Sequence, residues 1–235
     1  MKTRTYLSIC LLFCLLVLSG CFGKQRPMQQ QGITDVDACK HAPGQWQEVT
    51  DVVAATVTKT QYCTTCNELI ASETEPLTSM IRNGLFLFTP NEFLERFTAL
   101  ASQHTEGFSY EFVPEMGSLA NIYSNDKQAI LQFFRRDATL LKADELDTAE
   151  VWCVSLTGVD KSDATLRYCF LMACDPTLTM DSAFEVDIEL STALLNAAAN
   201  GKSTGYYQNN GMLYEHIYLP AQSMNLVNIY ASDFR

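Results

Sequence analysis

The segment Val151-Trp152-Cys153-Val154-Ser155-Leu156-Thr157 decides the expected fold, because large apolar residues begin to alternate with other residues there. Such alternation, with a period of two, is typical of a β-strand that buries one face. A second alternating run spans residues 165–172. When the two runs are paired about Lys161, the apolar faces match and Cys153 lies opposite Cys169. We therefore predict an antiparallel hairpin with a cross-strand Cys153–Cys169 disulfide.

The rest of the C-terminal half is predicted to extend this sheet. Residues 184–190 alternate apolar side chains with carboxylates, which indicates a strand with an acidic outer face. Asn209-Asn210-Gly211 is a strong hairpin signal between apolar runs. Further strands are expected at residues 205–208, 212–219 and 226–230. An Ala-rich helix is expected at residues 191–200, ending at Gly201.

The N-terminal half shows helix signals. Thr89-Pro90-Asn91-Glu92 combines a capping residue, a proline for the first helical position and a glutamate that completes a capping box. Ser124 is predicted to cap a second helix that runs to about Leu141. Arg82-Asn83-Gly84-Leu85 fits either a hairpin turn or a helix C-terminus.

The expected fold class is therefore α+β. A helical N-terminal half would pack on a mostly antiparallel sheet in the C-terminal half, with disulfides as staples. Residues 36–235 would form the globular part, and a subdivision near residues 145–150 stays open.

The first twenty residues have the order of a secretory signal. Lys2 and Arg4 precede an apolar run over residues 6–18, and the small residues Ser19 and Gly20 follow. The run is too short for a membrane span, which needs about 20 apolar residues. Leu18-Ser19-Gly20-Cys21 resembles the lipobox of bacterial lipoproteins.

This resemblance implies that cleavage precedes Cys21 and that Cys21 receives diacylglycerol and a further acyl chain such as palmitate. Several chains together would anchor the protein stably. Phe22, rather than an aspartate, follows the cysteine, which in that family favours the outer membrane and its periplasmic side. Residues 21–35 would form a flexible tether, since glycines and a proline interrupt the segment and the run Gln29-Gln30-Gln31 offers nothing to bury.

The charge balance argues against nucleic acid as a partner. The net charge is −11, and removal of residues 1–20 would change it to −13, because Lys2 and Arg4 are lost without an acidic residue. Such a protein repels phosphate backbones.

Six cysteines remain after the signal and the lipidated residue: Cys39, Cys63, Cys66, Cys153, Cys169 and Cys174. An even number in an exported chain predicts disulfides, of which only the pair above can be assigned. Cys63-Thr64-Thr65-Cys66 also fits a thiol–disulfide exchange motif. Cys39, His41, Cys63 and Cys66 are residue types that bind zinc, but oxidation competes with metal in such a compartment. We therefore expect disulfides to distant cysteines, and no metal or cofactor.

No catalytic arrangement stands out in the sequence. None of the histidines, His41, His104 and His216, lies beside a nucleophile in a known motif. His216 lies between Tyr214 and Tyr218 on one predicted strand face, with Tyr206 and Tyr207 nearby. Such polar-tipped aromatic residues suit a partner surface, although a packed sheet face explains them as well.

The leading functional hypothesis is a non-enzymatic outer-membrane lipoprotein that faces the periplasm. It would serve as a structural or assembly subunit of an envelope-spanning complex such as a secretion system, with other envelope proteins as partners. A second hypothesis is a lipoprotein that binds cell-wall glycan or a periplasmic ligand in a pocket lined by the tyrosines. A third is a thiol–disulfide oxidoreductase that uses Cys63 and Cys66.

Overall fold

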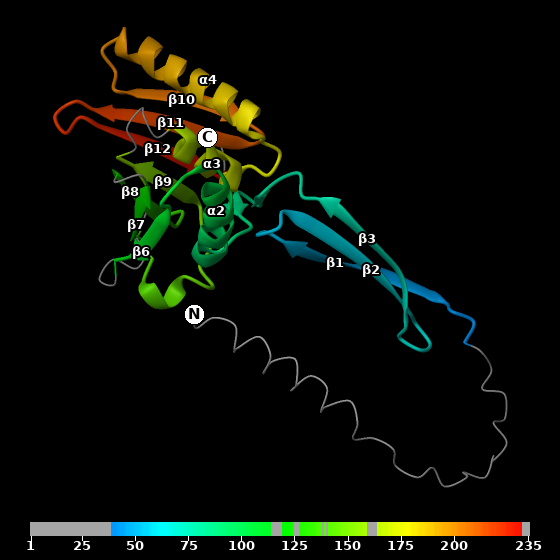
Figure 1. Cartoon of the computed structure of the whole chain (residues 1–235). Coiled ribbons are helices and arrows are strands. Elements are labelled where there is room, and N and C mark those ends of the chain that lie inside the picture. Colours follow the sequence, from blue (N-terminus) through cyan, green and yellow to red (C-terminus); the bar gives the residue numbers. More distant parts are fainter. Residues whose placement is uncertain are drawn as a thin grey trace, which may run out of the picture. The chain divides into compact units, whose positions relative to one another are not determined.

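The computed structural model describes residues 39–113, 119–124, 127–137, 139, 141–158 and 164–231. The chain divides into two compact units, residues 1–40 and residues 41–235. The predicted signal, the lipidation site Cys21 and the tether therefore lie outside the described residues. The second unit is mostly β-structure, with three sheets and three α-helices in its described part (Figure 1).

The first sheet has three antiparallel strands in chain order: β1 (Pro43–Asp51), β2 (Thr56–Cys63) and β3 (Leu69–Pro76). Threonines and valines in β1 and β2 suit extended backbone. Nearly every side chain of β1 and β3 is exposed, and those of β2 are only half-buried apart from Cys63. This sheet is therefore not the centre of the hydrophobic core.

The sheet is joined to the core at the end that holds the β1–β2 turn. The Arg96 guanidinium donates to the carbonyl oxygens of Val53 at 3.1 Å and of Met172 at 3.2 Å. Val52 and Leu77 are buried in the core, and the Leu77 amide donates to the Ala55 carbonyl at 2.8 Å.

The next segment decides between two alternatives and confirms one local prediction. Strands β4 (Ile81–Arg82) and β5 (Leu85–Phe86) form a hairpin, and Asn83 and Gly84 have φ of 56° and 73°. Of the two alternatives, the hairpin turn is thus correct. Helix α2 (Pro90–His104) starts as predicted, because Thr89 Oγ1 accepts from the Glu92 amide and the Glu92 carboxylate accepts from the Thr89 amide at 2.8 Å.

The largest sheet has seven antiparallel strands in the order β10-β11-β12-β9-β8-β7-β6. Their bounds are β6 (Ser109–Phe112), β7 (Leu119–Ser124), β8 (Lys127–Phe134), β9 (Cys153–Thr157), β10 (Thr204–Asn209), β11 (Met212–Leu219) and β12 (Met224–Tyr230). A short 3-10 helix, η1 (Ala143–Glu145), lies between β8 and β9. Because β8 pairs directly with β9, the sheet is continuous across residues 145–150.

One face of this sheet is buried under the helices. Its register aligns apolar side chains in rows, one of which is Ala120, Leu131, Leu156 and Val227. Helices α3 (Ala164–Cys174) and α4 (Met180–Ala198) complete the helical layer together with α2. The Phe93 ring is fully buried, and its centroid lies within about 6 Å of those of Phe88, Phe97, Phe133 and Phe170.

Helix α4 runs alongside β10 and β11 at one edge of the sheet (Figure 1). A buried ion pair joins it to α3, with Arg167 Nη2 2.6 Å from Asp187 Oδ2. Gly205 of β10 makes the close approach possible, because a Cβ atom there would lie 2.2 Å from the Leu194 amide nitrogen. None of the helices in the described part of the chain is both long and apolar enough to cross a membrane.

The expected α+β division was wrong in its N-terminal half. Residues 43–86 form strands, and the segment from Ser124, predicted as a helix, forms the β7–β8 hairpin with Ser124 opposite Lys127. Ala129, Leu131 and Phe133 alternate into the core, so a period of two describes β8 better than the predicted helical period. The C-terminal half does contribute strands to an antiparallel sheet. Only some of the residues that were predicted as strands there lie in this sheet, because residues 164–174 and 180–198 are helical.

The predicted disulfide hairpin was also wrong. Cys153 lies in β9 as expected, but residues 164–174 form helix α3, and β9 pairs with β8 and β12 instead. Cys153 and Cys169 are not joined by a disulfide, and neither is Cys174. All three thiols are buried in the core, and burial raises their pKa, that of Cys169 to about 11.

Residues 184–190 are part of α4 rather than a strand. Helix α4 buries Ala183, Val186, Asp187 and Leu190, whose spacing is helical, and it exposes Phe184 and Ile188. Asp187 can be buried because Arg167 neutralises its charge. The prediction placed this carboxylate on the exposed face of a strand, since its partner lies outside the segment. The hairpin at Asn210 and Gly211 is confirmed, with φ of 49° and 75° at these positions.

Candidate functional site

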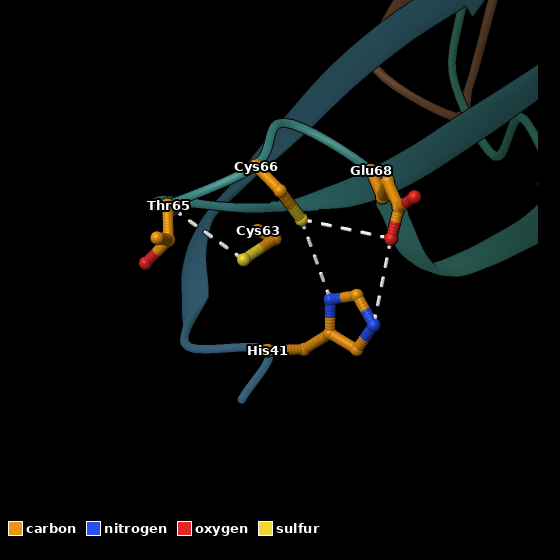
Figure 2. A network of polar contacts seen from close by, with 5 residues as sticks. All are labelled: His41, Cys63, Thr65, Cys66 and Glu68. Atoms are coloured by element: carbon orange, nitrogen blue, oxygen red, sulfur yellow. Dashed lines mark hydrogen bonds and ion pairs between the residues drawn. The ribbon is translucent and has the colours of Figure 1, made fainter. Parts of the chain in front are cut away.

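The strand pairing of the first sheet brings His41 next to the Cys63–Cys66 turn. Pro43 at the start of β1 pairs with Cys63 at the end of β2. Gly44 permits this, since a Cβ atom there would lie 2.8 Å from the Tyr62 carbonyl oxygen. Figure 2 shows one ring nitrogen of His41 facing the Cys66 thiol and the other facing the Glu68 carboxylate.

The potential ligand atoms lie close together. Cys66 Sγ is 3.5 Å from His41 Nδ1 and 3.6 Å from Glu68 Oε2. The other ring nitrogen, His41 Nε2, is 3.5 Å from the same Glu68 oxygen. The atoms of His41, Cys63 and Cys66 that can hold a metal all lie within 4.8 Å of one another. Glu68 thus contacts both the ring and a thiol (Figure 2).

Backbone hydrogen bonds shape the turn around the Cys63 sulfur. The Cys63 amide donates to the Glu68 carbonyl at 2.8 Å, the Asn67 amide donates to the Cys63 carbonyl at 2.9 Å, and Asn67 has φ of 59°. The Thr65 amide points at Cys63 Sγ, 3.4 Å away. Hydrogen bonding from the Cys66 backbone, followed by that from Thr65 and His41, lowers the pKa of Cys63 to about 5.

A thiolate stabilised in this way can act as a metal ligand or as a nucleophile. Cys39, which belongs to the other unit, precedes His41 by only two residues in the chain. The structure therefore groups three of the four residues that the sequence analysis named for zinc. Glu68 was missed, and its only signal was a carboxylate two residues after Cys66. Cys174, considered as a disulfide partner, is instead buried in the core.

The predicted tyrosine surface is split. Tyr214 is fully buried, Tyr207 is half-buried and Tyr206 is exposed. His216 and Tyr218 line a separate pocket of about 590 Å³ between α4 and β11, together with Leu194, Leu195 and Lys202. His216 Nε2 lies 3.1 Å from Asn225 Oδ1, while Nδ1 is buried without a hydrogen-bond partner among the described residues. Burial lowers the pKa of His216, which favours a neutral ring.

A second polar cluster lies on the other face of the large sheet. Glu215 accepts from the Tyr230 hydroxyl at 2.6 Å and from the Asn228 amide nitrogen at 2.7 Å. No local sequence pattern marks this cluster, because Glu215 lies on β11 whereas Asn228 and Tyr230 lie on β12. The hydrogen bonds satisfy a nearly buried carboxylate, so we assign the cluster a structural role.

Comparisons of the chain with protein-family models, with curated proteins and with solved structures gave no match.

Proposed function

We propose that the protein is an outer-membrane lipoprotein that faces the periplasm and binds other envelope proteins through the β1–β3 sheet. It would serve as a structural or assembly subunit of an envelope-spanning complex, such as a secretion system. The lipobox-like sequence at Cys21 supports the membrane location. The observation that carries the binding role is the openness of the three-stranded sheet.

Both edge strands of this sheet are open. In the described part of the chain, β1 and β3 each pair only with β2. An open edge presents unpaired amide and carbonyl groups that can accept a further strand. Natural proteins usually protect such edges, so a long open edge indicates a use for it.

The side chains of the sheet indicate the chemistry of the partner. Trp46, Val49, Leu69 and Ile70 are large apolar residues that are 39–65% exposed. Strand β3 also carries the exposed carboxylates of Glu73 and Glu75, of which Glu75 is paired with Lys59. An extended segment with both apolar and basic side chains would complement this surface in shape and charge. We infer that the partner presents such a segment.

Site-specific photo-crosslinking in intact cells tests the proposal. A photoreactive residue at Ile70 should capture a defined envelope protein, whereas the same residue at Glu189, exposed on α4, should not. Glu73→Lys should reduce the yield at Ile70, and Cys21→Ser should abolish it by releasing the protein from the membrane. Equal capture from Ile70 and Glu189, or none from either, would contradict the proposal.

A second candidate function is binding of a cell-wall glycan or a small periplasmic ligand. The pocket between α4 and β11 favours it, because 590 Å³ falls in the range of small-molecule sites, and apolar walls meet polar groups from Lys202 and His216. Tyr218→Ser should weaken retention on purified peptidoglycan if this is correct, and the Tyr206→Ser variant should not. Identical retention of both variants and the unmodified protein would exclude the pocket as the glycan site.

A further inference from the structure

We propose that His41, Cys63 and Cys66 bind one zinc ion that joins the start of β1 to the end of β2. This inference concerns side-chain donor atoms at one end of the sheet, whereas the proposed function rests on the unpaired edges of β1 and β3, so either can fail without the other.

The donor atoms match zinc in type and spacing. Zinc binds thiolate sulfur at about 2.3 Å and imidazole nitrogen at about 2.0–2.1 Å, almost always with tetrahedral geometry in structural sites. Such geometry separates a sulfur from a nitrogen ligand by about 3.6 Å and two sulfurs by about 3.8 Å. The measured distance from Cys66 Sγ to His41 Nδ1 is 3.5 Å. The wider spacing, up to 4.8 Å within the group, would contract by about 1 Å around an ion.

Two groups next to the donor atoms are placed as the groups around a bound metal usually are. The Thr65 amide points at the Cys63 sulfur, which stabilises a thiolate there. Glu68 contacts His41 Nε2 at 3.5 Å, and this contact fixes the ring with Nδ1 toward Cys66. A carboxylate on the far nitrogen of a ligating histidine is the usual way to orient the ring and raise its basicity.

The sequence offers a fourth donor of suitable type, Cys39, two residues before His41. The register of β1 and β2 holds His41 and the Cys63–Cys66 turn together, and only Lys40 separates Cys39 from His41 in the chain. A Cys₃His set would close the tetrahedron without a water position, which would make the site structural rather than catalytic. The ion would link two neighbouring strands at the end of the sheet that lies away from the Arg96 contacts.

Metal analysis of the full-length protein, purified in detergent without chelators, tests the proposal. We expect about one zinc per chain. Cobalt exchanged into the site should give a sulfur-to-metal charge-transfer band in the near ultraviolet and the visible bands of tetrahedral cobalt. Cys66→Ser and His41→Asn should lose both signals. His104→Asn, which changes an exposed histidine at the end of α2, should retain them.

Two further measurements separate a built site from adventitious binding. Glu68→Gln should retain zinc but weaken its affinity by about 10–100-fold, as expected for loss of a supporting carboxylate. Removal of zinc should increase hydrogen exchange at the Cys63 and Thr64 amides, which donate to the Glu68 and Ala42 carbonyls. A disulfide among Cys39, Cys63 and Cys66 in the freshly purified protein, or loss of zinc in His104→Asn, would overturn the proposal.

Discussion

The ion pair between Arg167 of α3 and Asp187 of α4 leads to a sharp stability prediction. Both side chains are only 9% exposed, and Arg167 Nη2 lies 2.6 Å from Asp187 Oδ2. With the charge centres about 4 Å apart and an effective dielectric constant of about 20, the attraction is about 4 kcal/mol. Desolvation of the two ions opposes this attraction by several kcal/mol for each ion. The net contribution of the pair is therefore small, although neither charge can be removed alone without leaving the other uncompensated.

The three variants of a double-mutant cycle should thus show a distinctive pattern. Arg167→Met and Asp187→Leu should each lower the free energy of unfolding by about 3–5 kcal/mol, because a buried charge loses its partner. The double variant should lie within about 2 kcal/mol of the unmodified protein, or be more stable, since apolar side chains replace both ions. Urea denaturation of the full-length protein, followed by circular dichroism, measures all three free energies.

The additivity of the two single effects decides the outcome. If the double variant were destabilised by the sum of the two single losses, the residues would act independently and the ion-pair explanation would be refuted. A matched control is Arg135→Met, which breaks the more exposed pair with Glu145. This variant should change the free energy of unfolding by no more than about 1 kcal/mol.

Other predictions follow from the core and from one histidine. Phe93→Ala should destabilise the protein by about 3–5 kcal/mol, because it leaves a cavity at the centre of the aromatic cluster. Phe184→Ala, on the exposed side of α4, should change stability by less than about 1 kcal/mol. Equal effects of the two variants in thermal denaturation would contradict the assigned core. Gly205→Ala should destabilise the protein by at least about 1–3 kcal/mol, because its Cβ would clash with the α4 backbone. Gly201→Ala should cost less stability, about 1 kcal/mol, because only the positive φ of 72° disfavours a side chain there. Burial lowers the pKa of His216 in the folded protein, so below about pH 6.5 the unfolded chain binds the proton more readily and stability falls as the pH decreases. In urea titrations at several pH values, His216→Gln should flatten this dependence, and an unchanged slope would show that another group causes it.

Local signals in the sequence predicted the elements whose geometry depends on a few neighbouring residues. The α2 start needs only the reciprocal bonds between Thr89 and Glu92, and both form. The predicted Asn210-Gly211 turn needs positive φ at two adjacent positions, which asparagine and glycine adopt most easily. The Asn83-Gly84 turn has the same geometry, but there the sequence left a helix C-terminus open as an alternative. No distant contact is required for these features, so a short stretch of sequence is sufficient to specify them.

Hydrophobic periodicity misled where nearly every position is apolar or where a charge is buried. Residues 165–172 alternate in size, but helix α3 buries Leu166, Cys169 and Phe170 at helical spacing. Both periods fit such a segment, because few polar residues mark an exposed face. In α4, Asp187 lies on the buried side because of Arg167, twenty residues earlier in the chain. That tertiary contact is invisible to any pattern within α4.

The residue types of the candidate metal site could be named from the sequence, but their arrangement could not. Cys63 and Cys66 form an evident pair, and Cys39 and His41 are the nearest further donors of suitable type. Their proximity depends on Pro43 pairing with Cys63, which is a register between two strands rather than a local preference. Glu68 acquires its role only after the ring of His41 is placed.

The three core thiols have a consequence for how the chain reaches its folded state. Cys153, Cys169 and Cys174 are inaccessible in the fold, and their raised pKa values keep them protonated and unreactive. In the unfolded chain the same thiols are exposed to any oxidant. If folding takes place in an oxidising compartment, burial must outpace disulfide formation, because a disulfide between two of these residues made too early would trap a non-native chain. The yield of native protein would then be set by a kinetic competition, and a chaperone or reductase that delays oxidation would raise it.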